Sequence, residues 1–282
     1  MKIYIRTLGT FLTAFLLLLA ISCGKKDASQ LDLKIVNTDN LKEKNGLMYE
    51  AANPGPFSGI AQKFTEKSIL FSEKTYKNGV LEGKTIYYWS KSKKKFEVDF
   101  KAGKKHGKSL EWTQDGTLII SENFIDGKLD GIQESWFESG KAKSRSSFEK
   151  GIRTGKFENW YENGNKKFEE NFKDGTKNGY RRFWYENGQI EGEGVFANDI
   201  VNGKTTGWHN NGKKMYEGSY IYGKMNGTFF NWYENGNLKS EENFKEDIKH
   251  GAFKYWDKEG RLAKEEYYRD GVQVEKEKFT AK

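Results

Sequence analysis

Aromatic residues and glycines recur along this chain at a fixed interval, with polar residues between them. From Gly59 onward the interval is 24 residues, and a tryptophan column and a second aromatic column both follow it. The tryptophans in phase are Trp112, Trp136, Trp160, Trp184, Trp208, Trp232 and Trp256. Only Trp89 lies one position away from this column. A fixed internal period of this length predicts tandem supersecondary units that stack on one another.

The repeat that starts at Gly155 shows how one unit is built. Residues 156–161 and 166–172 are rich in aromatic residues, which favours two short strands. Between them stands Asn163-Gly164, a pair that accepts positive φ in a tight turn, and the same glycine column contains Gly188 and Gly236. Turn signals thus fall about every 12 residues, the spacing of antiparallel hairpins. The prediction is an all-β chain, an elongated meandering antiparallel sheet of tandem 24-residue β-hairpins.

The aromatic columns are expected to hold neighbouring hairpins together. Stacking would place tryptophan beside tryptophan and phenylalanine beside phenylalanine, with about 0.2–1 kcal/mol from each cross-strand pair. Some eighteen strands spaced by ~4.8 Å would extend roughly 85 Å. Hydrophobic residues make up only 35% of the chain, so we expect one shallow layer and no thick core. Four positions depart from the repeat and predict irregular hairpins: Gly192, Asp199, Gly207 and Asp247.

The first residues have the pattern of an export signal. Lys2 and Arg6 precede an apolar run over residues 8–21, which is short for a membrane-spanning helix. Soon after the run comes Cys23, the single cysteine of the chain. Small residues before a cysteine at this place resemble the lipobox of bacterial lipoproteins. The resemblance implies a signal peptide over residues 1–22 and attachment of lipid, palmitate included, at Cys23.

The rest of the chain divides by its polar pattern. Residues 23–45 are predicted to be the lipid-attached cysteine and a tether, residues 46–275 the tandem hairpins, and residues 276–282 a C-terminal tail. Inside the tether, residues 31–36 alternate between apolar and polar as a half-buried strand does.

The repeated unit resembles a known family. Its pattern, G-x4-W-Y-E-N-G-x4-E-x2-F-x2-G, is clearest at Trp160, Tyr161, Asn163, Gly164, Glu169, Phe172 and Gly175. It is similar to the MORN-repeat-variant family of bacteria over about residues 46–271. The resemblance implies a meandering antiparallel sheet. Some bacterial members carry an antitoxin label, and related MORN repeats have been linked to membranes and to scaffolding.

The repeats offer no set of residues for catalysis or for a cofactor. His106 and His250 share one turn column, and His209 follows Trp208 in the place of an aromatic residue. The best candidates for paired catalytic carboxylates form a column: Glu97, Glu169, Glu193, Glu217, Glu241 and Glu265. A general acid and a general base need different environments, which equivalent repeat positions do not offer. We expect no enzymatic activity, no cofactor and no metal site, and expect these glutamates to pair with lysines across strands.

What remains is a repeated surface on a chain whose net charge is +8. Charges of both signs alternate through the repeats, so nucleic acid is not an expected partner. Residues that follow the tryptophans are predicted to face the other side of the sheet and to contact a ligand: Phe137, Tyr161, Tyr185 and Tyr233. The leading hypothesis is a non-enzymatic lipoprotein of the bacterial envelope, anchored in the outer membrane on its periplasmic or surface face, that acts as a scaffold for a protein partner. An antitoxin-like protein that neutralises a toxin is the alternative, and an envelope glycan-degrading enzyme is the third hypothesis.

Overall fold

Turns set the architecture, because a glycine-containing turn follows almost every run of alternating residues. The computed structural model describes residues 33–90 and 92–280, and the predicted signal peptide and Cys23 lie outside this part of the chain. Its elements in chain order are β1 (Ile35–Asn37), η1 (Thr38–Asn40), β2 (Leu41–Lys44), β3 (Leu47–Glu50), β4 (Gly59–Phe64), β5 (Leu70–Lys77), β6 (Val80–Ser90), β7 (Lys93–Lys101), β8 (Lys104–Trp112), β9 (Leu118–Ile125), β10 (Lys128–Leu129), β11 (Gly131–Trp136), β12 (Ala142–Glu149), β13 (Ile152–Trp160), β14 (Lys166–Lys173), β15 (Thr176–Trp184), β16 (Ile190–Ala197), β17 (Ile200–Trp208), β18 (Lys214–Ile221), β19 (Lys224–Met225), β20 (Gly227–Trp232), β21 (Leu238–Lys245), β22 (Ile248–Trp256), β23 (Leu262–Arg269), β24 (Val272–Val274) and α1 (Lys276–Thr280).

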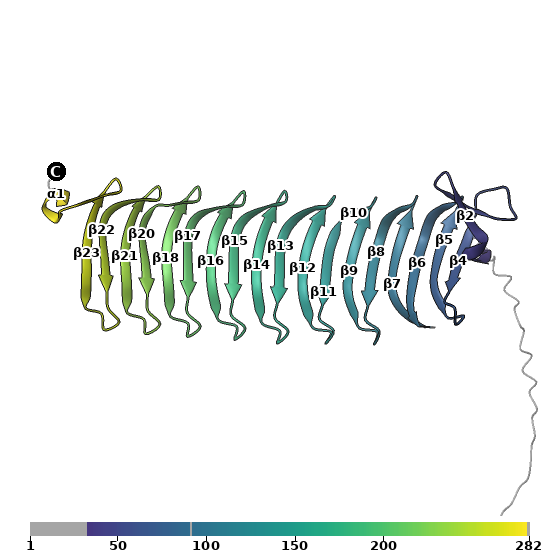
Figure 1. The fold of residues 1–282 in the computed structure, drawn as a ribbon, viewed down its shortest axis with the longest axis horizontal. Helices are drawn as coiled ribbons and strands as arrows, with labels where there is room; N and C mark the ends of the chain where they lie inside the picture. The colour runs from purple at the N-terminus through teal and green to yellow at the C-terminus, as the bar shows by residue number, and fades with distance from the viewer. Residues whose placement is uncertain (1–32, 91, 281–282) are drawn as a thin grey trace, which may run out of the picture. The chain divides into compact units, whose positions relative to one another are not determined.

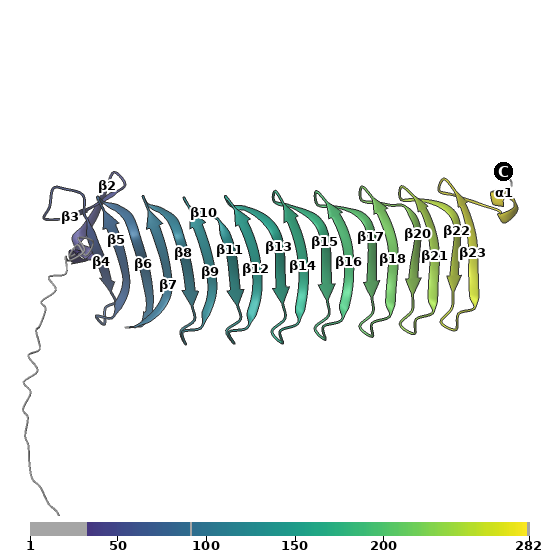
Figure 2. The same ribbon diagram turned by 180° about the vertical axis from the view of Figure 1, so that it is seen from behind.

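The strands from β4 to β23 form one sheet in which each strand pairs antiparallel with the strands before and after it in the chain (Figure 1). The same row of strands between two rows of turns is seen from behind (Figure 2). β10 with β11 and β19 with β20 each form one strand interrupted at a single residue, so β4 to β23 amount to the eighteen strands expected. The all-β meander of tandem hairpins predicted from the sequence is confirmed.

The sheet has two chemically distinct faces. In β13, Glu158 and Trp160 point to one side and Phe157 to the other, because successive residues of a strand alternate. The side of the tryptophan column is termed the indole face, and the opposite side the phenylalanine face. Small and apolar side chains are most deeply buried on the phenylalanine face, where Val98 and Phe253 are 2% and 0% exposed. The single layer follows from this composition, because rows of side chains on one face take the place of a central core.

Both ends of the row of strands carry short covering elements. β1 pairs parallel with β4. A buried apolar cluster lies there and consists of Val36, Leu41, Phe57, Ala61 and Tyr76. Within the predicted tether of residues 23–45, β1, η1 and β2 occupy residues 35–44. At the other end the predicted tail contains α1, whose Phe279 ring lies 5.4 Å from that of Tyr267. No helix in the described part of the chain is long and apolar enough to span a membrane.

The turns at the two long edges of the sheet differ in backbone geometry. At one edge, termed the Asn-Gly edge, Gly164 has φ +96° while Asn163 keeps a negative φ and accepts the Asn165 N–H through its side chain. At the other, termed the Asp-Gly edge, Asp174 and Gly175 both have positive φ, of 51° and 82°. The prediction of positive φ at Asn-Gly was thus right only for the glycine.

The four positions that depart from the repeat do not disturb the hairpins. Asp199 and Asp247 replace glycine at the left-handed position of the Asp-Gly edge, with φ of 66° and 68°. Gly192 and Gly207 are paired opposite each other, as the equivalent residues Phe168 and Phe183 are one repeat earlier. The expectation of irregular hairpins was wrong, because aspartate tolerates the left-handed region and glycine in a strand leaves room that a neighbouring ring fills.

Candidate functional site

The tryptophan column runs along the indole face at the strand ends near the Asn-Gly edge. Successive members lie two strands apart, which is about 9.6 Å and too far for ring contact. Among the described residues no tryptophan ring packs on another, so the prediction of tryptophan beside tryptophan was wrong. A lysine lies between them instead: Lys166 Nζ is 5.7 Å from the ring centre of Trp184, and Lys214 Nζ is 5.5 Å from that of Trp232.

The glutamate column lies beside these lysines on the same face. Glu169 pairs with Lys156 at 3.3 Å and with Lys166 at 2.5 Å, and Glu217 pairs with Lys204 and Lys214 in the same way. Burial favours the neutral acid, but hydrogen bonds from the two lysines outweigh it and lower the pKa of Glu169 from its usual 4.5. The predicted pairing of glutamates with lysines across strands is confirmed here, and these carboxylates are ionised, which suits ion pairing and does not suit a general acid.

The indole rings are half-buried, and their polar ends reach the surface. Within the described residues, Nε1 of the seven in-phase tryptophans donates no hydrogen bond, and none of these nitrogens is buried without a partner. A row of apolar rings with available N–H donors can bind a partner that offers apolar area and hydrogen-bond acceptors at the same time. The indole face is therefore the candidate binding surface.

The residues that follow the tryptophans hold adjacent repeats together. The hydroxyl groups of Tyr161, Tyr185 and Tyr233 donate to main-chain carbonyl oxygens of the tryptophans one repeat later, at 3.0, 2.7 and 2.9 Å. These residues begin the turns, and the opposite-facing column predicted for them stays a prediction. Phe137 has no hydroxyl group, and Lys143 Nζ lies 5.6 Å from its ring centre. Ligand contact at these four residues stays a prediction.

Two residues that looked anomalous occupy the same structural place as these tyrosines. Trp89 Nε1 donates to the carbonyl oxygen of Trp112 at 2.9 Å, and His209 Nε2 lies 3.0 Å from the carbonyl oxygen of Trp232. Both contacts join residues 23 positions apart. That offset, one less than the repeat, is the signal by which the ladder could have been found.

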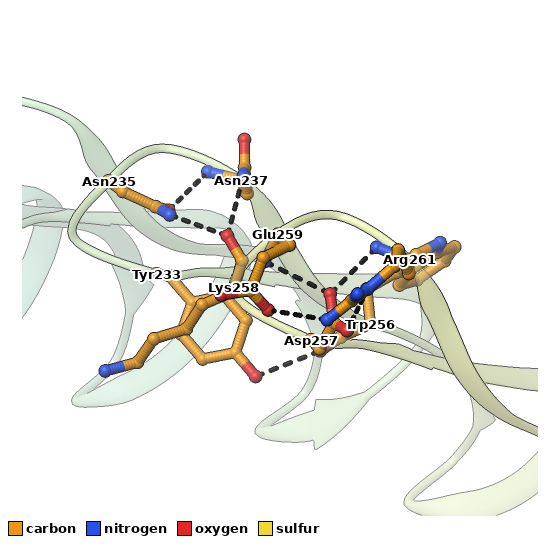
Figure 3. Close-up of polar contacts among 8 residues, drawn as sticks. All are labelled: Tyr233, Asn235, Asn237, Trp256, Asp257, Lys258, Glu259 and Arg261. Carbon is orange, nitrogen blue, oxygen red and sulfur yellow. Dashed lines mark hydrogen bonds and ion pairs between the residues drawn. The ribbon is translucent and has the colours of Figure 1, made fainter.

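Asparagine side chains make a second ladder at the same edge. At its last junction, Asn235 and Asn237 both donate to the carbonyl oxygen of Lys258, each at 2.7 Å, while Tyr233 bonds the carbonyl oxygen of Trp256 (Figure 3). The histidines of the Asp-Gly edge also serve a turn, since His250 Nδ1 lies 3.2 Å from an oxygen of the Asp270 carboxylate. Neither edge assembles a catalytic set, and no group of three potential metal ligands occurs in the described part of the chain.

A single sheet of tandem hairpins joined by edge ladders defines a β-hairpin repeat protein. Comparison with protein families matches residues 153–174, 177–198, 225–246 and 249–270 to the MORN repeat variant family. These four repeats are therefore MORN-variant repeats, as their pattern indicated. This family is generally non-catalytic, and it supports a repeat-based role in protein interaction or membrane binding. Comparison with curated proteins gives no match.

Proposed function

We propose that the protein is a non-enzymatic, lipid-anchored scaffold of the bacterial cell envelope that binds a protein partner along its indole face. The binding part rests on the row of half-buried tryptophans whose N–H groups have no acceptor among the described residues. Indole rings are enriched at protein interfaces, where they supply both apolar area and a donor. The lysine–glutamate clusters between them supply charges of both signs, which favours register and specificity of binding.

The anchoring part rests on the sequence that precedes the sheet. An apolar run, small residues and then the lone Cys23 form a lipobox-like signal. A single acyl chain holds a protein on a membrane only marginally, whereas two or more anchor it stably. Anchoring would hold the repeats close to the envelope, where a partner meets them at raised local concentration.

Replacing Cys23 tests the anchor. Cys23→Ser should move the protein from the membrane fraction to the soluble fraction, and the matched variant Ser22→Ala, which keeps the cysteine, should stay on the membrane. Membrane retention of the serine variant would contradict lipid anchoring. Protease treatment of intact and lysed cells then separates a surface-exposed sheet from a periplasmic one. A soluble protein of full, uncleaved length would instead support the antitoxin-like alternative.

Site-specific photo-crosslinking tests the binding surface. Tyr180 lies on the indole face and is 50% exposed, and Tyr222 lies in a turn of the Asp-Gly edge and is 78% exposed. A photoreactive residue at position 180 should capture a discrete partner in cells, while the same residue at position 222 should not. Equal capture at both positions, or capture at position 222 alone, would count against the indole face.

A further inference from the structure

A hollow on the phenylalanine face differs from every other part of the repeat array. It lies over β5 to β8 and is lined by Phe71, Tyr87, Lys95, Phe96 and Glu111. Tyr87, Phe96 and Glu111 are directly opposite one another in three successive strands. Among the described hairpins, two aromatic residues face each other at this pairing position here alone. The later hairpins pair an aromatic residue with a polar residue or glycine, two small polar residues, or, in one case, glutamate with isoleucine.

Three rings form the apolar part of the hollow. The ring centres of Phe71 and Tyr87 are 5.9 Å apart at an angle of 83°, and those of Tyr87 and Phe96 are 6.3 Å apart at 46°. Phe71 is 43% exposed although it belongs to this cluster. Rings set at steep angles to one another present both faces and edges to the space between them, and ring faces attract cations.

The same rings already attract the protein's own cations. Lys74 Nζ lies 5.8 Å from the ring centre of Tyr87, and Lys105 Nζ lies 5.6 Å from that of Phe96. Neither lysine lines the hollow. Both contacts show that the faces of these rings accept an ammonium group.

The two charged residues that line the hollow are unequally engaged. Lys95 Nζ lies 4.2 Å from the ring centre of Trp89, which directs its charge to that indole. The carboxylate of Glu111 makes no ion pair or side-chain hydrogen bond with any residue that the structure describes. Three rings with one unpaired carboxylate are the components of a site for an ammonium ion that carries alkyl groups.

We propose that this hollow binds a quaternary or alkylated ammonium group, whose alkyl groups contact Phe71, Tyr87 and Phe96 and whose charge is balanced by Glu111. A quaternary ammonium needs no hydrogen-bond acceptor, which matches a lining that is mostly aromatic. The site lies on the face opposite the indole row, so it goes beyond the scaffold role and stands or falls independently of it.

Choline titrated into the detergent-solubilised full-length chain, followed by NMR or calorimetry, tests the site. Choline should bind at least about tenfold more tightly than 3,3-dimethylbutanol, its neutral isostere, because the charge contributes through the rings and Glu111. Equal binding of the two would overturn the proposal, since the hollow would then be only an apolar depression. Tighter binding of benzoate than of choline would overturn it too, because Lys95 would then define the ligand.

Variants separate the site from the fold. Glu111→Gln keeps the side-chain shape and should weaken choline binding about fivefold or more. Phe96→Leu removes an aromatic ring and should weaken choline binding to a similar extent. The matched controls Glu242→Gln and Phe168→Leu lie on the same face away from the hollow and should leave binding unchanged. Unchanged binding in Glu111→Gln, with circular dichroism confirming an intact sheet, would refute the assigned role of that carboxylate.

Discussion

A glycine in the middle of the array gives the sharpest test of how the rows of side chains pack. Gly207 lies opposite Tyr216, and a Cβ atom added at Gly207 would lie 2.2 Å from Cε1 of that ring and 2.6 Å from Cδ1 and Cζ. These distances are far inside van der Waals contact, so the ring of Tyr216 has to move. The tyrosine ring thus occupies the space that every residue except glycine would fill.

The magnitude follows from two opposing effects. Overpacking of this kind costs about 1–3 kcal/mol, and the replacement of glycine by alanine in a strand regains about 0.5–1 kcal/mol. Gly207→Ala should therefore destabilise the protein by about 0.5–2 kcal/mol, a fall in Tm of roughly 2–6 °C. Gly192→Ala is the matched control, because its added Cβ would lie 3.6 Å from the nearest atoms and should leave stability unchanged or slightly raised.

Thermal unfolding followed by circular dichroism gives the global change, and hydrogen exchange of β17 and β18 gives the local one, because repeat arrays can open segment by segment. In the double variant Gly207→Ala/Tyr216→Ala the new methyl group no longer meets a ring. The double variant should be more stable than the sum of the single changes predicts, by about 1 kcal/mol. Additive changes, or equal stability of Gly207→Ala and Gly192→Ala, would refute the packing argument.

Three further predictions concern the edges and the ion pairs. Asp199→Ala should lower the free energy of unfolding, measured with denaturant, by about 1–2 kcal/mol, because it removes the hydrogen bond of 2.9 Å from the Lys177 N–H to the aspartate and leaves alanine at a φ of 66°. Asp199→Gly loses the same bond but relieves the backbone, so its stability should lie within about 0.5 kcal/mol of the parent. Tyr185→Phe should cost about 1 kcal/mol in the same assay through loss of its bond to Trp208, and an unchanged midpoint would contradict the ladder's contribution. Because the pKa of Glu169 is lower in the folded protein than its usual 4.5, the ionised carboxylate stabilises the fold above pH 4.5, and this stabilisation is lost as the pH falls through the folded-state pKa. Glu169→Gln should therefore flatten the acid limb of a plot of Tm against pH.

The sequence predicts the hairpins well because turn residues and aromatic residues act locally. Gly164 needs its left-handed backbone whichever repeat follows, and Trp160 occupies a strand whichever strand lies beside it. Contacts between repeats were harder to predict. The position of Lys166 beside Trp184 depends on the distance spanned by two strands, and the folding of Val36 onto the first hairpin involves a segment with no repeat to compare.

Near-identical repeats raise the question of how each hairpin finds its own neighbour, because a shift by one whole repeat would preserve the strand pattern. The ladders at the edges cannot answer it, since they join equivalent groups in most repeats. The exceptions to the repeat can. A Cβ at Gly218 would lie 2.2 Å from the ring of Phe229, so this ring lies directly over the glycine, whereas the equivalent places in other hairpins hold Glu170 and Glu242. A hairpin docked against either of those would lose this contact, because a glutamate side chain occupies the space that is open over Gly218. Departures from the consensus thus disfavour misregistered pairings and help each strand to pair with one partner.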